Sequence, residues 1–310
     1  MRAVRCIEGQ ARVVDVPRPT GEGVVVTVAS AGICGSDLHL LPMGLPATFG
    51  HELAGTLPDG RVVAVEPLAP CWECAACLSG DYPRCVLGPA IVLGVGLDGG
   101  MADECLVPAS ALAPLPAGVD AADGCLVEPL AVAVHGVRRG AIQGGERVAV
   151  IGGGSIGQTA LVAAQAAGAH VDLVARHDRQ REAAARLGAG EPTDGYDVVI
   201  EAAGTDSAMA DAVSRCRPGG RVVLLASYWD GVVQLPGLEV TMKEVTLVPA
   251  AMYGRVGPSR DIDVAAALLA ARPELPGTII THRFPLDAAH EAFAVAADRA
   301  AGAIKVVLEP

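Results

Sequence analysis

The pattern of hydrophobic positions changes near residue 121, and the two parts of the chain predict two kinds of domain. Before that point, short β-branched runs such as Val24–Val28 and Arg61–Val65 are separated by glycines, serines and the turn Pro58–Gly60. Short β-branched runs bounded by turn residues are typical of strands. We therefore expect a small, turn-rich β domain in the first part of the chain.

The second part alternates apolar strands with helical stretches. A helical segment covers 121–137, and the strand Arg147–Ile151 leads into a glycine-rich turn and a helix over 158–167. Further strands are expected at His170–Ala175, Asp197–Ile200, Arg221–Leu225 and Glu244–Val248. This alternation predicts a parallel, doubly wound α/β sheet. The segment 284–308 is expected to form a helix and then a strand that returns to the first domain.

Composition narrows the classes of function. The 310 residues are enough for two domains, and a net charge of −12 argues against nucleic acid or an anionic membrane as a partner. No segment has the length of a membrane span, and the first residues lead into strand-like sequence without an apolar signal core. We expect a soluble, cytoplasmic protein whose nine cysteines are reduced, so that clustered cysteines indicate metal.

The stretch Cys34–Glu52 combines a thiol, an imidazole and a carboxylate, the ligand types that zinc prefers. On these residues alone, two interpretations are open. Cys34 and His51 could ligate a metal, or they could be an ordinary buried thiol and a satisfied core histidine.

A second cysteine group gives a sharper signal. Cys71, Cys74, Cys77 and Cys85 follow one another at spacings of three, three and eight positions. Four thiolates on short turns can close a tetrahedral zinc site with no position left for substrate, so this cysteine lobe (residues 71–85) predicts a structural zinc. Disulfides and independent buried thiols are the alternatives. The other four cysteines are scattered and expected in the core: Cys6, Cys105, Cys125 and Cys216.

The strand Arg147–Ile151 ends in a turn that predicts dinucleotide binding. The turn reads Gly152-Gly153-Gly154-Ser155-Ile156-Gly157 and leads directly into a helix. In this strand–turn–helix setting, Gly152 permits the tight turn, Gly154 lets the backbone approach a pyrophosphate, and Gly157 lets the helix pack on the strand. The phosphates would then lie at the helix N-terminus.

The end of the next strand bears on the choice of cofactor. An acidic residue there normally binds the ribose 2′-hydroxyl of NAD, whereas a 2′-phosphate is accommodated by arginine. The chain has Ala175 at that end, followed by Arg176, and Asp172 falls inside the strand. Our hypothesis is NADP(H) in preference to NAD(H), with Arg176 as the phosphate partner. The alternative is that Arg176 is a solvated surface charge.

Several motifs in this order resemble the zinc-containing alcohol and polyol dehydrogenases of the medium-chain dehydrogenase/reductase superfamily, in its sorbitol-dehydrogenase-like branch. They are Gly32-Ile33-Cys34-Gly35-Ser36-Asp37, Gly50-His51-Glu52, the cysteine lobe, Glu128-Pro129-Leu130, the glycine turn and Thr281-His282-Arg283-Phe284-Pro285-Leu286. The resemblance implies a GroES-like catalytic domain from residues 1–123 and 266–310, interrupted by a Rossmann domain at 124–265.

The resemblance also implies roles for single residues. Cys34, His51 and Glu128 are similar to the catalytic zinc ligands, and Glu52 lies beside the metal, where it binds directly or exchanges with water in related enzymes. Cys125, three residues before Glu128, is an alternative ligand, although the Glu-Pro-Leu match favours Glu128. Three further residues match supporting roles: Asp37 the carboxylate that orients His51, and Ser36 and His39 the proton relay.

Taken together, the resemblance implies hydride transfer between NADP(H) or NAD(H) and a secondary alcohol or ketone, with two zinc ions per chain. Glu128 favours a polyol, sugar or aminocyclitol substrate, whereas the apolar, shortened loop between His39 and Gly50 favours something less polar. A homodimer or homotetramer is usual among such enzymes. The alternatives are a zinc-free quinone or enoyl reductase, which would lack Cys34 and His51, and a non-catalytic binding protein on the same fold.

Overall fold

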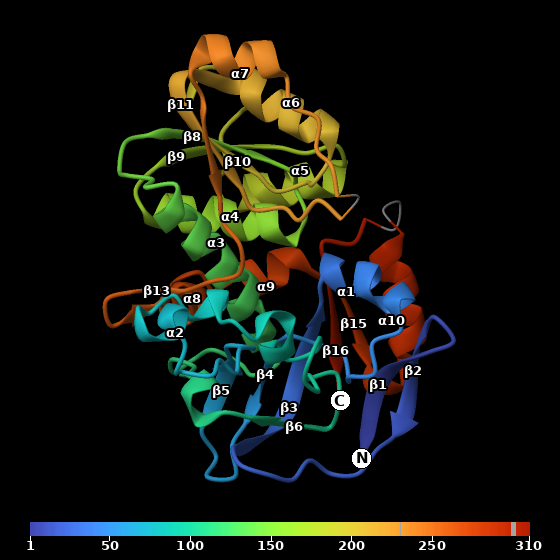
Figure 1. Ribbon diagram of the computed structural model, residues 1–310. Coiled ribbons are helices and arrows are strands. Elements are labelled where there is room, and N and C mark those ends of the chain that lie inside the picture. The colour runs from blue at the N-terminus through green and yellow to red at the C-terminus, as the bar shows by residue number, and fades with distance from the viewer. Residues whose placement is uncertain (230, 299–301) are drawn as a thin grey trace. The chain divides into compact units, whose positions relative to one another are not determined.

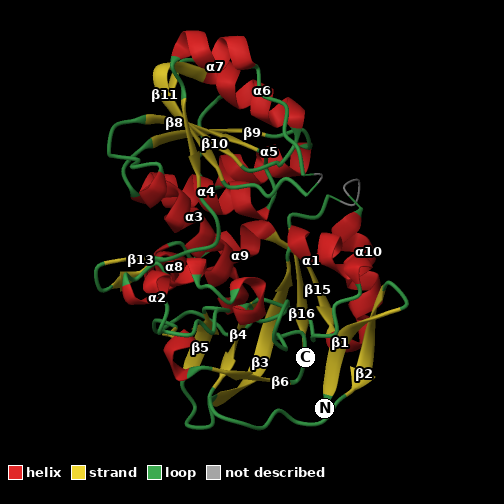
Figure 2. Ribbon diagram, in the orientation of Figure 1, coloured by secondary structure: helices red, strands yellow, loops and turns green. Residues whose placement is uncertain are grey.

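The computed structural model describes residues 1–229, 231–298 and 302–310. The chain forms two compact units: unit 1 comprises Met1–Glu128 and Gly254–Pro310, and unit 2 comprises Pro129–Tyr253. Figure 1 follows the chain through both units, and Figure 2 shows where each is helical or extended.

Unit 1 is built on a seven-stranded sheet in the order β15-β16-β3-β4-β5-β7, with β6 paired to β3. The strands of this sheet are β3 (Val24–Ile33), β4 (Glu52–Thr56), β5 (Val62–Val65), β6 (Glu104–Val107), β7 (Leu112–Pro114), β15 (Ile280–Pro285) and β16 (Lys305–Glu309). Two hairpins stand apart, β1 (Arg2–Ile7) with β2 (Gln10–Asp15) and β13 (Arg255–Val256) with β14 (Ser259–Arg260). The helices of unit 1 are α1 (Gly35–Leu40), α2 (Ala75–Leu78), α8 (Asp261–Ala271), α9 (Glu274–Ile279) and α10 (Ala289–Ala297).

The core of unit 1 joins the beginning of the chain to its end. Phe49 meets Phe293 of α10 edge to face, with ring centroids 6.0 Å apart, and both rings are buried. Strand β16 pairs antiparallel with β3, placing Val306 opposite Ile33. The prediction that the last segment forms a helix and then a strand that returns to the first domain is confirmed.

Unit 2 holds a five-stranded parallel sheet in the order β12-β11-β10-β8-β9. Its strands are β8 (Arg147–Ile151), β9 (His170–Val174), β10 (Tyr196–Glu201), β11 (Cys216–Leu224) and β12 (Thr246–Pro249). Its helices are α3 (Val127–Arg139), α4 (Ser155–Ala166), α5 (Asp178–Arg186), α6 (Asp206–Arg215) and α7 (Gly237–Lys243). Most side chains of β8 and β10 are buried, as strands covered by helices on both faces require. The predicted α/β class, with a β-rich domain and a doubly wound sheet, is confirmed.

The boundary between the domains differs from the sequence-based estimate. We expected the second domain to span 124–265, whereas unit 2 ends at Tyr253. The segment from Gly254 belongs to unit 1 because Arg260 donates hydrogen bonds to the carbonyls of Ser110 and Leu112, next to and within β7. The Ala- and Leu-rich helix α8 has the composition of a Rossmann helix, so its sequence carried no sign of this packing.

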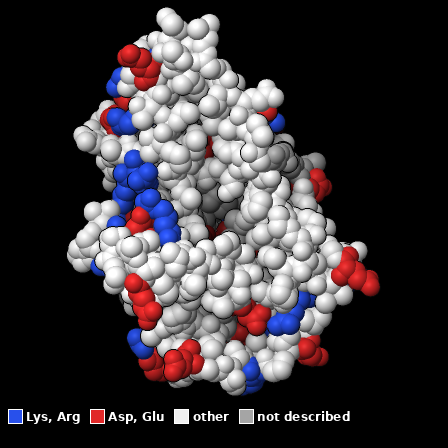
Figure 3. Space-filling model, viewed as in Figure 1, with Lys and Arg blue, Asp and Glu red and all other residues white. Residues whose placement is uncertain are grey.

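Charge and apolarity on the surface agree with the composition. In the described part of the chain, no helix combines the length and apolarity needed to cross a bilayer. The face drawn in Figure 3 is mostly uncharged, with acidic side chains in small separate groups and one contiguous group of Lys and Arg side chains at the middle of its left side.

Candidate metal centres and dinucleotide-binding turn

Strands β3 and β4 bring the two ends of the Cys34–Glu52 stretch together. They pair antiparallel with Gly32 opposite Glu52, so Cys34, just after β3, lies beside His51, just before β4. The approach is tight, because a Cβ atom at Gly32 would lie 2.0 Å from Glu52 Oε2. Glycine at this position is therefore what allows the carboxylate to lie against the neighbouring strand.

The side chains of Cys34, His51 and Glu52 form a compact set of possible metal ligands, called the donor cluster below. One ligand atom from each lies within 4.8 Å of the others. His51 and Glu52 are buried and Cys34 is partly exposed, so the cluster can be reached from one side. Sulfur, nitrogen and oxygen in this combination suit zinc. The residues present therefore fit the metal that the resemblance implies.

Asp37 on α1 lies beside the His51 ring. Its Oδ1 lies 3.5 Å from His51 Nδ1, and its Oδ2 accepts a hydrogen bond of 2.9 Å from the backbone N–H of Cys34. Burial raises the pKa of Asp37, and the neighbouring His51 partly offsets this. Burial would lower the pKa of His51, but the charges of Asp37 and Cys34 outweigh it and raise the pKa. This carboxylate leaves Nε2 as the nitrogen for a metal, the arrangement common around metal-bound histidines.

Lys305, at the start of β16, holds the carboxylate of Glu52. Its Nζ lies 2.7 Å and 2.5 Å from the two carboxylate oxygens and also donates to the carbonyl of Ile33 at 3.1 Å. Both side chains are almost completely buried. Burial would lower the pKa of Lys305, but Glu52 and Cys34 outweigh it and raise the pKa. Sequence reasoning missed Lys305, whose only signal was a single charge in an apolar strand.

Glu128 and Cys125, the two candidates for a further ligand, both lie outside the donor cluster. Glu128 is buried in the first turn of α3, and its charge contributes to the raised pKa of His51. Its carboxylate, however, does not belong to the group whose atoms lie within 4.8 Å of one another. Cys125 is fully buried, with a pKa raised to about 12 mainly by burial, and its backbone N–H donates to Ser30 Oγ. Glu128 stays a predicted ligand.

The predicted relay residues share α1. Ser36 Oγ lies 3.4 Å from His51 Nε2, within reach of any molecule bound at the donor cluster. His39 follows three residues later and is exposed. Residues three apart lie on the same face of a helix, so the two side chains can lead from the cluster toward solvent.

The cysteine lobe also collects its predicted ligands. The sulfur atoms of its four cysteines lie within 4.8 Å of one another, with Cys85 Sγ 3.5 Å and Cys77 Sγ 3.9 Å from Cys71 Sγ. The backbone N–H groups of Val86 and Cys77 lower the pKa of Cys74 to about 6, which favours the thiolate that metals bind. Four sulfurs fit zinc in a closed, structural site.

A buried polar network connects the cysteine lobe to the rest of unit 1. Tyr82, between the third and fourth cysteines, donates a 2.5 Å hydrogen bond to Glu66 Oε1, and its ring packs on Trp72 at a centroid distance of 5.4 Å. Arg260 lies 3.5 Å from the other Glu66 oxygen. Burial raises the pKa of Glu66 to about 7, although Tyr82 and Arg260 oppose the shift. The sequence contained no signal for this network, because its three elements are far apart along the chain.

The glycine turn of unit 2 has the shape that a dinucleotide requires. A Cβ atom at Gly154 would meet open space, whereas one at Gly157 would lie 1.8 Å from the carbonyl oxygen of Gly152. The hydroxyl of Ser155, the first residue of α4, is buried without a hydrogen-bond partner. Open space over the turn, a close-packed helix and an unpartnered hydroxyl at the N-terminus fit a bound pyrophosphate.

The end of β9 shows why an acidic partner for ribose is missing. Asp172 lies inside the strand, and its Oδ2 accepts a 2.7 Å hydrogen bond from the hydroxyl of Tyr196. Ala175 follows the strand, and the guanidinium of Arg176 donates a 2.8 Å hydrogen bond to Ser207 Oγ. The structure therefore places an arginine, and no carboxylate, directly after Ala175.

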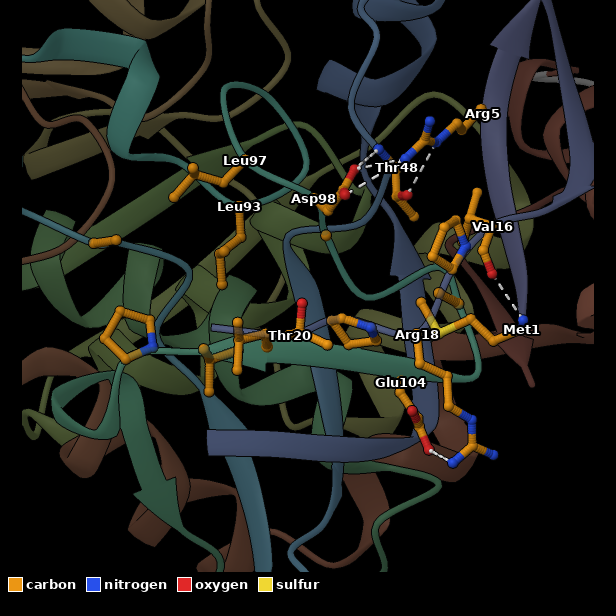
Figure 4. A pocket seen from close by; sticks show the side chains of 18 of the residues that line it. Met1, Arg5, Val16, Arg18, Thr20, Thr48, Leu93, Leu97, Asp98 and Glu104 are labelled. Atoms are coloured by element: carbon orange, nitrogen blue, oxygen red, sulfur yellow. Dashed lines mark hydrogen bonds and ion pairs between the residues drawn. The ribbon is translucent and has the colours of Figure 1, made fainter. Parts of the chain in front are cut away.

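A surface pocket of unit 1 lies apart from these sites. It has a volume of about 540 Å³ and is lined by the segment 16–22, the turn around Leu97 and strand β6, with none of the donor cluster among its lining residues. Figure 4 shows the charged side chains that it labels, Arg5, Asp98, Arg18 and Glu104, in pairs. Arg5 contacts both Asp98 and Thr48, and Arg18 contacts Glu104 at 3.3 Å. The pocket therefore offers little unpaired charge to a ligand.

Comparison with known proteins shows which family this chain belongs to. The family model for the alcohol dehydrogenase GroES-like domain matches residues 20–117, and the model for zinc-binding dehydrogenases matches residues 190–271. L-galactonate-5-dehydrogenase of Escherichia coli K12 is 31% identical over 303 residues, covering 87% of each chain. The chain belongs to the zinc-containing medium-chain dehydrogenase/reductases. Within them it lies in the alcohol and polyol dehydrogenase branch, and it is an oxidoreductase.

Two further relatives extend the comparison. Human sorbitol dehydrogenase is 30% identical over 318 residues, covering 90% of this chain and 87% of its own. A zinc-binding dehydrogenase from Sinorhizobium meliloti 1021, solved bound to NADP, superposes with a TM-score of 0.86 at 29% identity and covers 100% of this chain and 99% of its own. Membership of this family agrees with the two-unit fold and with the metal-binding side chains described above.

Proposed function

We propose that this dehydrogenase transfers a hydride between NADP(H) and a secondary alcohol or ketone, with a polyol, sugar or aminocyclitol as substrate. The observation that carries the proposal is the donor cluster, where a thiol, an imidazole and a carboxylate meet within 4.8 Å. The names of the two curated relatives, a sugar-acid dehydrogenase and a polyol dehydrogenase, support this class of substrate.

The donor cluster would hold the catalytic zinc through Cys34 and His51, with Glu52 or Glu128 as a further ligand. When bound, zinc acts as a Lewis acid that makes a substrate hydroxyl easier to deprotonate. Glu52 is already held by Lys305, so its binding to the metal would disturb a buried ion pair. The cysteine lobe would hold a second, structural zinc.

The remaining chemistry comes from side chains of α1. Ser36 Oγ would accept the hydroxyl proton of the substrate, and exposed His39 would pass it to solvent. Asp37 keeps the His51 ring in place through Nδ1 while the charge of the substrate changes. When bound, the nicotinamide cofactor would supply the hydride acceptor or donor for this reaction.

Unit 2 would bind the cofactor through the glycine turn and the end of β9. The turn from Gly152 to Gly157 would receive the pyrophosphate, with Ser155 and Ile156 at the N-terminus of α4. Arg176 after Ala175 favours a 2′-phosphate, and the bound NADP of the Sinorhizobium relative supports this preference. We expect a homodimer or homotetramer, as the resemblance implies.

Zinc content and cofactor titration test the proposal directly. Purified enzyme should contain two zinc atoms per chain, and NADPH fluorescence should show tighter binding than NADH. A screen of secondary alcohols and ketones with both cofactors should then give turnover on a polyol or sugar derivative. One zinc per chain without turnover would support a non-catalytic or zinc-free alternative, and tighter NADH binding would overturn the cofactor preference.

A further inference from the structure

Arg176 and Ser207 meet across the carboxyl end of β8. In the sheet, β8 lies between β9 and β10, so the segments after β9 and β10 are separated by the glycine turn. Arg176 comes after β9 and Ser207 comes after β10, in the first turn of α6. Their 2.8 Å hydrogen bond therefore spans the end of the strand whose turn is expected to receive the pyrophosphate.

Ser207 is held in place by its own segment. Its Oγ lies 3.2 Å from Thr205 Oγ1, which caps α6 by accepting a hydrogen bond from the N–H of Ala208. The preceding residues are fixed by Glu201, a buried carboxylate that accepts hydrogen bonds of 2.8 Å and 2.9 Å from the N–H groups of Ala203 and Gly204. Ser207 thus presents its hydroxyl to Arg176 from a segment with little freedom to move.

The backbone at Arg176 is fixed as well. Arg181 on α5 donates hydrogen bonds of 2.9 Å and 2.8 Å to the carbonyls of Ala175 and Arg176. The nearby acids are engaged elsewhere: Asp178 pairs with Arg181, and Asp206 accepts a 2.9 Å hydrogen bond from the N–H of Gln234. Neither acid neutralises the guanidinium of Arg176 through a contact recorded among the described residues.

The chemistry of this pair suits a phosphate monoester better than a hydroxyl. A guanidinium carries five N–H donors, so one bond to Ser207 leaves the others for phosphate oxygens. The serine oxygen accepts from arginine and can turn its own proton from Thr205 to a phosphate oxygen. A ribose hydroxyl, uncharged and with a single oxygen, would gain much less from the two side chains.

We propose that Ser207 determines cofactor specificity, orienting Arg176 for the 2′-phosphate of NADP(H) and donating its own hydrogen bond to that phosphate. This inference rests on the proposed preference for NADP(H). It adds a residue about thirty positions beyond the strand end that suggested the preference, in the first turn of α6.

Direct binding measurements test the proposal without relying on turnover. With NADPH and NADH titrated by fluorescence, Ser207→Ala should weaken NADPH binding about tenfold or more, the effect of one hydrogen bond to a charged group, and change NADH binding less than twofold. Ser207→Thr, which keeps the hydroxyl, should restore most of the NADPH affinity. Ser214→Ala, the same substitution at an exposed position of α6, is the matched control and should change neither affinity.

A double-mutant cycle separates this inference from the proposed function. Arg176→Ala should remove most of the preference for NADPH, and adding Ser207→Ala should then weaken NADPH binding less than the same substitution does in the wild type, because the orienting role of Ser207 is lost with the arginine. If Arg176→Ala changes the preference but Ser207→Ala does not, the role of Ser207 is wrong and the cofactor preference stands. If Ser207→Ala weakens NADPH equally with and without Arg176, the coupling is refuted. If Arg176→Ala leaves the preference unchanged, both proposals fail.

Discussion

The donor cluster and the cysteine lobe, both in unit 1, bring their candidate metal ligands together in opposite ways. The lobe takes all four sulfurs from fifteen consecutive residues. The donor cluster takes its ligands from the ends of two paired strands, and its carboxylate is held by Lys305 from the far end of the chain. A site built from local turns depends mainly on its own metal, whereas a site built by the sheet depends on the whole domain.

The largest effect should come from removing a ligand of the donor cluster. Cys34→Ser or His51→Ala should lower turnover by roughly a thousandfold or more, since the Lewis acid is lost. Zinc content should fall from two atoms to one, and NADPH affinity should stay within twofold, because the glycine turn belongs to unit 2. Turnover retained in both variants would contradict the catalytic assignment.

Removing a ligand of the cysteine lobe should lower the thermal stability of the protein more than it lowers turnover. In Cys77→Ser, the lobe loses its metal, and the apparent Tm should fall by roughly 10 °C or more. Calorimetry with and without added zinc measures the change. Cys216→Ser, at a buried cysteine outside both metal centres, is the control and should leave zinc content at two. An unchanged Tm with one zinc lost would show that the lobe folds without metal.

Removing Lys305 should show how far the donor cluster depends on remote residues. Lys305→Met leaves the Glu52 carboxylate buried without its cation, which typically costs about 3 to 5 kcal/mol of unfolding free energy. The double variant Lys305→Met with Glu52→Gln should recover part of this loss, because no buried charge is left alone. Urea unfolding of the three proteins measures both effects, and equal stability of the single and double variants would contradict the argument.

The smallest expected effect concerns the anchor of the cysteine lobe and depends on pH. Because burial raises the pKa of Glu66 to about 7 from an ordinary value near 4.5, the folded state holds its proton longer than the unfolded state does. The contribution of Glu66 to stability is therefore complete below about pH 4.5 and is lost as the pH rises through 7.

Glu66→Gln should remove this pH dependence. Relative to the variant, the wild type should lose up to about 3 kcal/mol between pH 5 and pH 8, measured by urea unfolding at several pH values. Glu73→Gln, at an exposed acid in the cysteine lobe, is the control and should follow the wild type. Parallel curves for wild type and Glu66→Gln would show that Glu66 titrates normally.

Local patterns accounted for most of what the sequence could predict. The four cysteines, the glycine turn and the strand Arg147–Ile151 depend on neighbours within a few positions, so spacing alone was sufficient for them. Lys305 and Ser207 were missed because their partners, Glu52 and Arg176, lie far away in sequence. Neither Lys305 nor Ser207 stands in a local sequence motif. Their roles become visible only when the folded sheet brings their partners close.

Unit 2 ends before the domain boundary that we expected from the sequence, and the reason is related. Helix α8 is rich in alanine and leucine, a composition that fits either unit, and only the contacts of Arg260 with Ser110 and Leu112 assign it to unit 1. The position of Glu128 outside the donor cluster could not be predicted from the sequence either. The match of its motif to the family fixes a residue type, whereas the distance to His51 depends on how α3 begins.

The pairing of β16 with β3 has a consequence for the order of events during synthesis. Residues 129–253 leave the ribosome as one uninterrupted stretch, so unit 2 can fold while the chain is still growing. Unit 1 has to wait for β15 and β16, and until they arrive the Ile33 edge of β3 is exposed and Glu52 has no cation. Nascent chains stopped before residue 280 should therefore bind NADPH and still lack a stable donor cluster for the catalytic zinc.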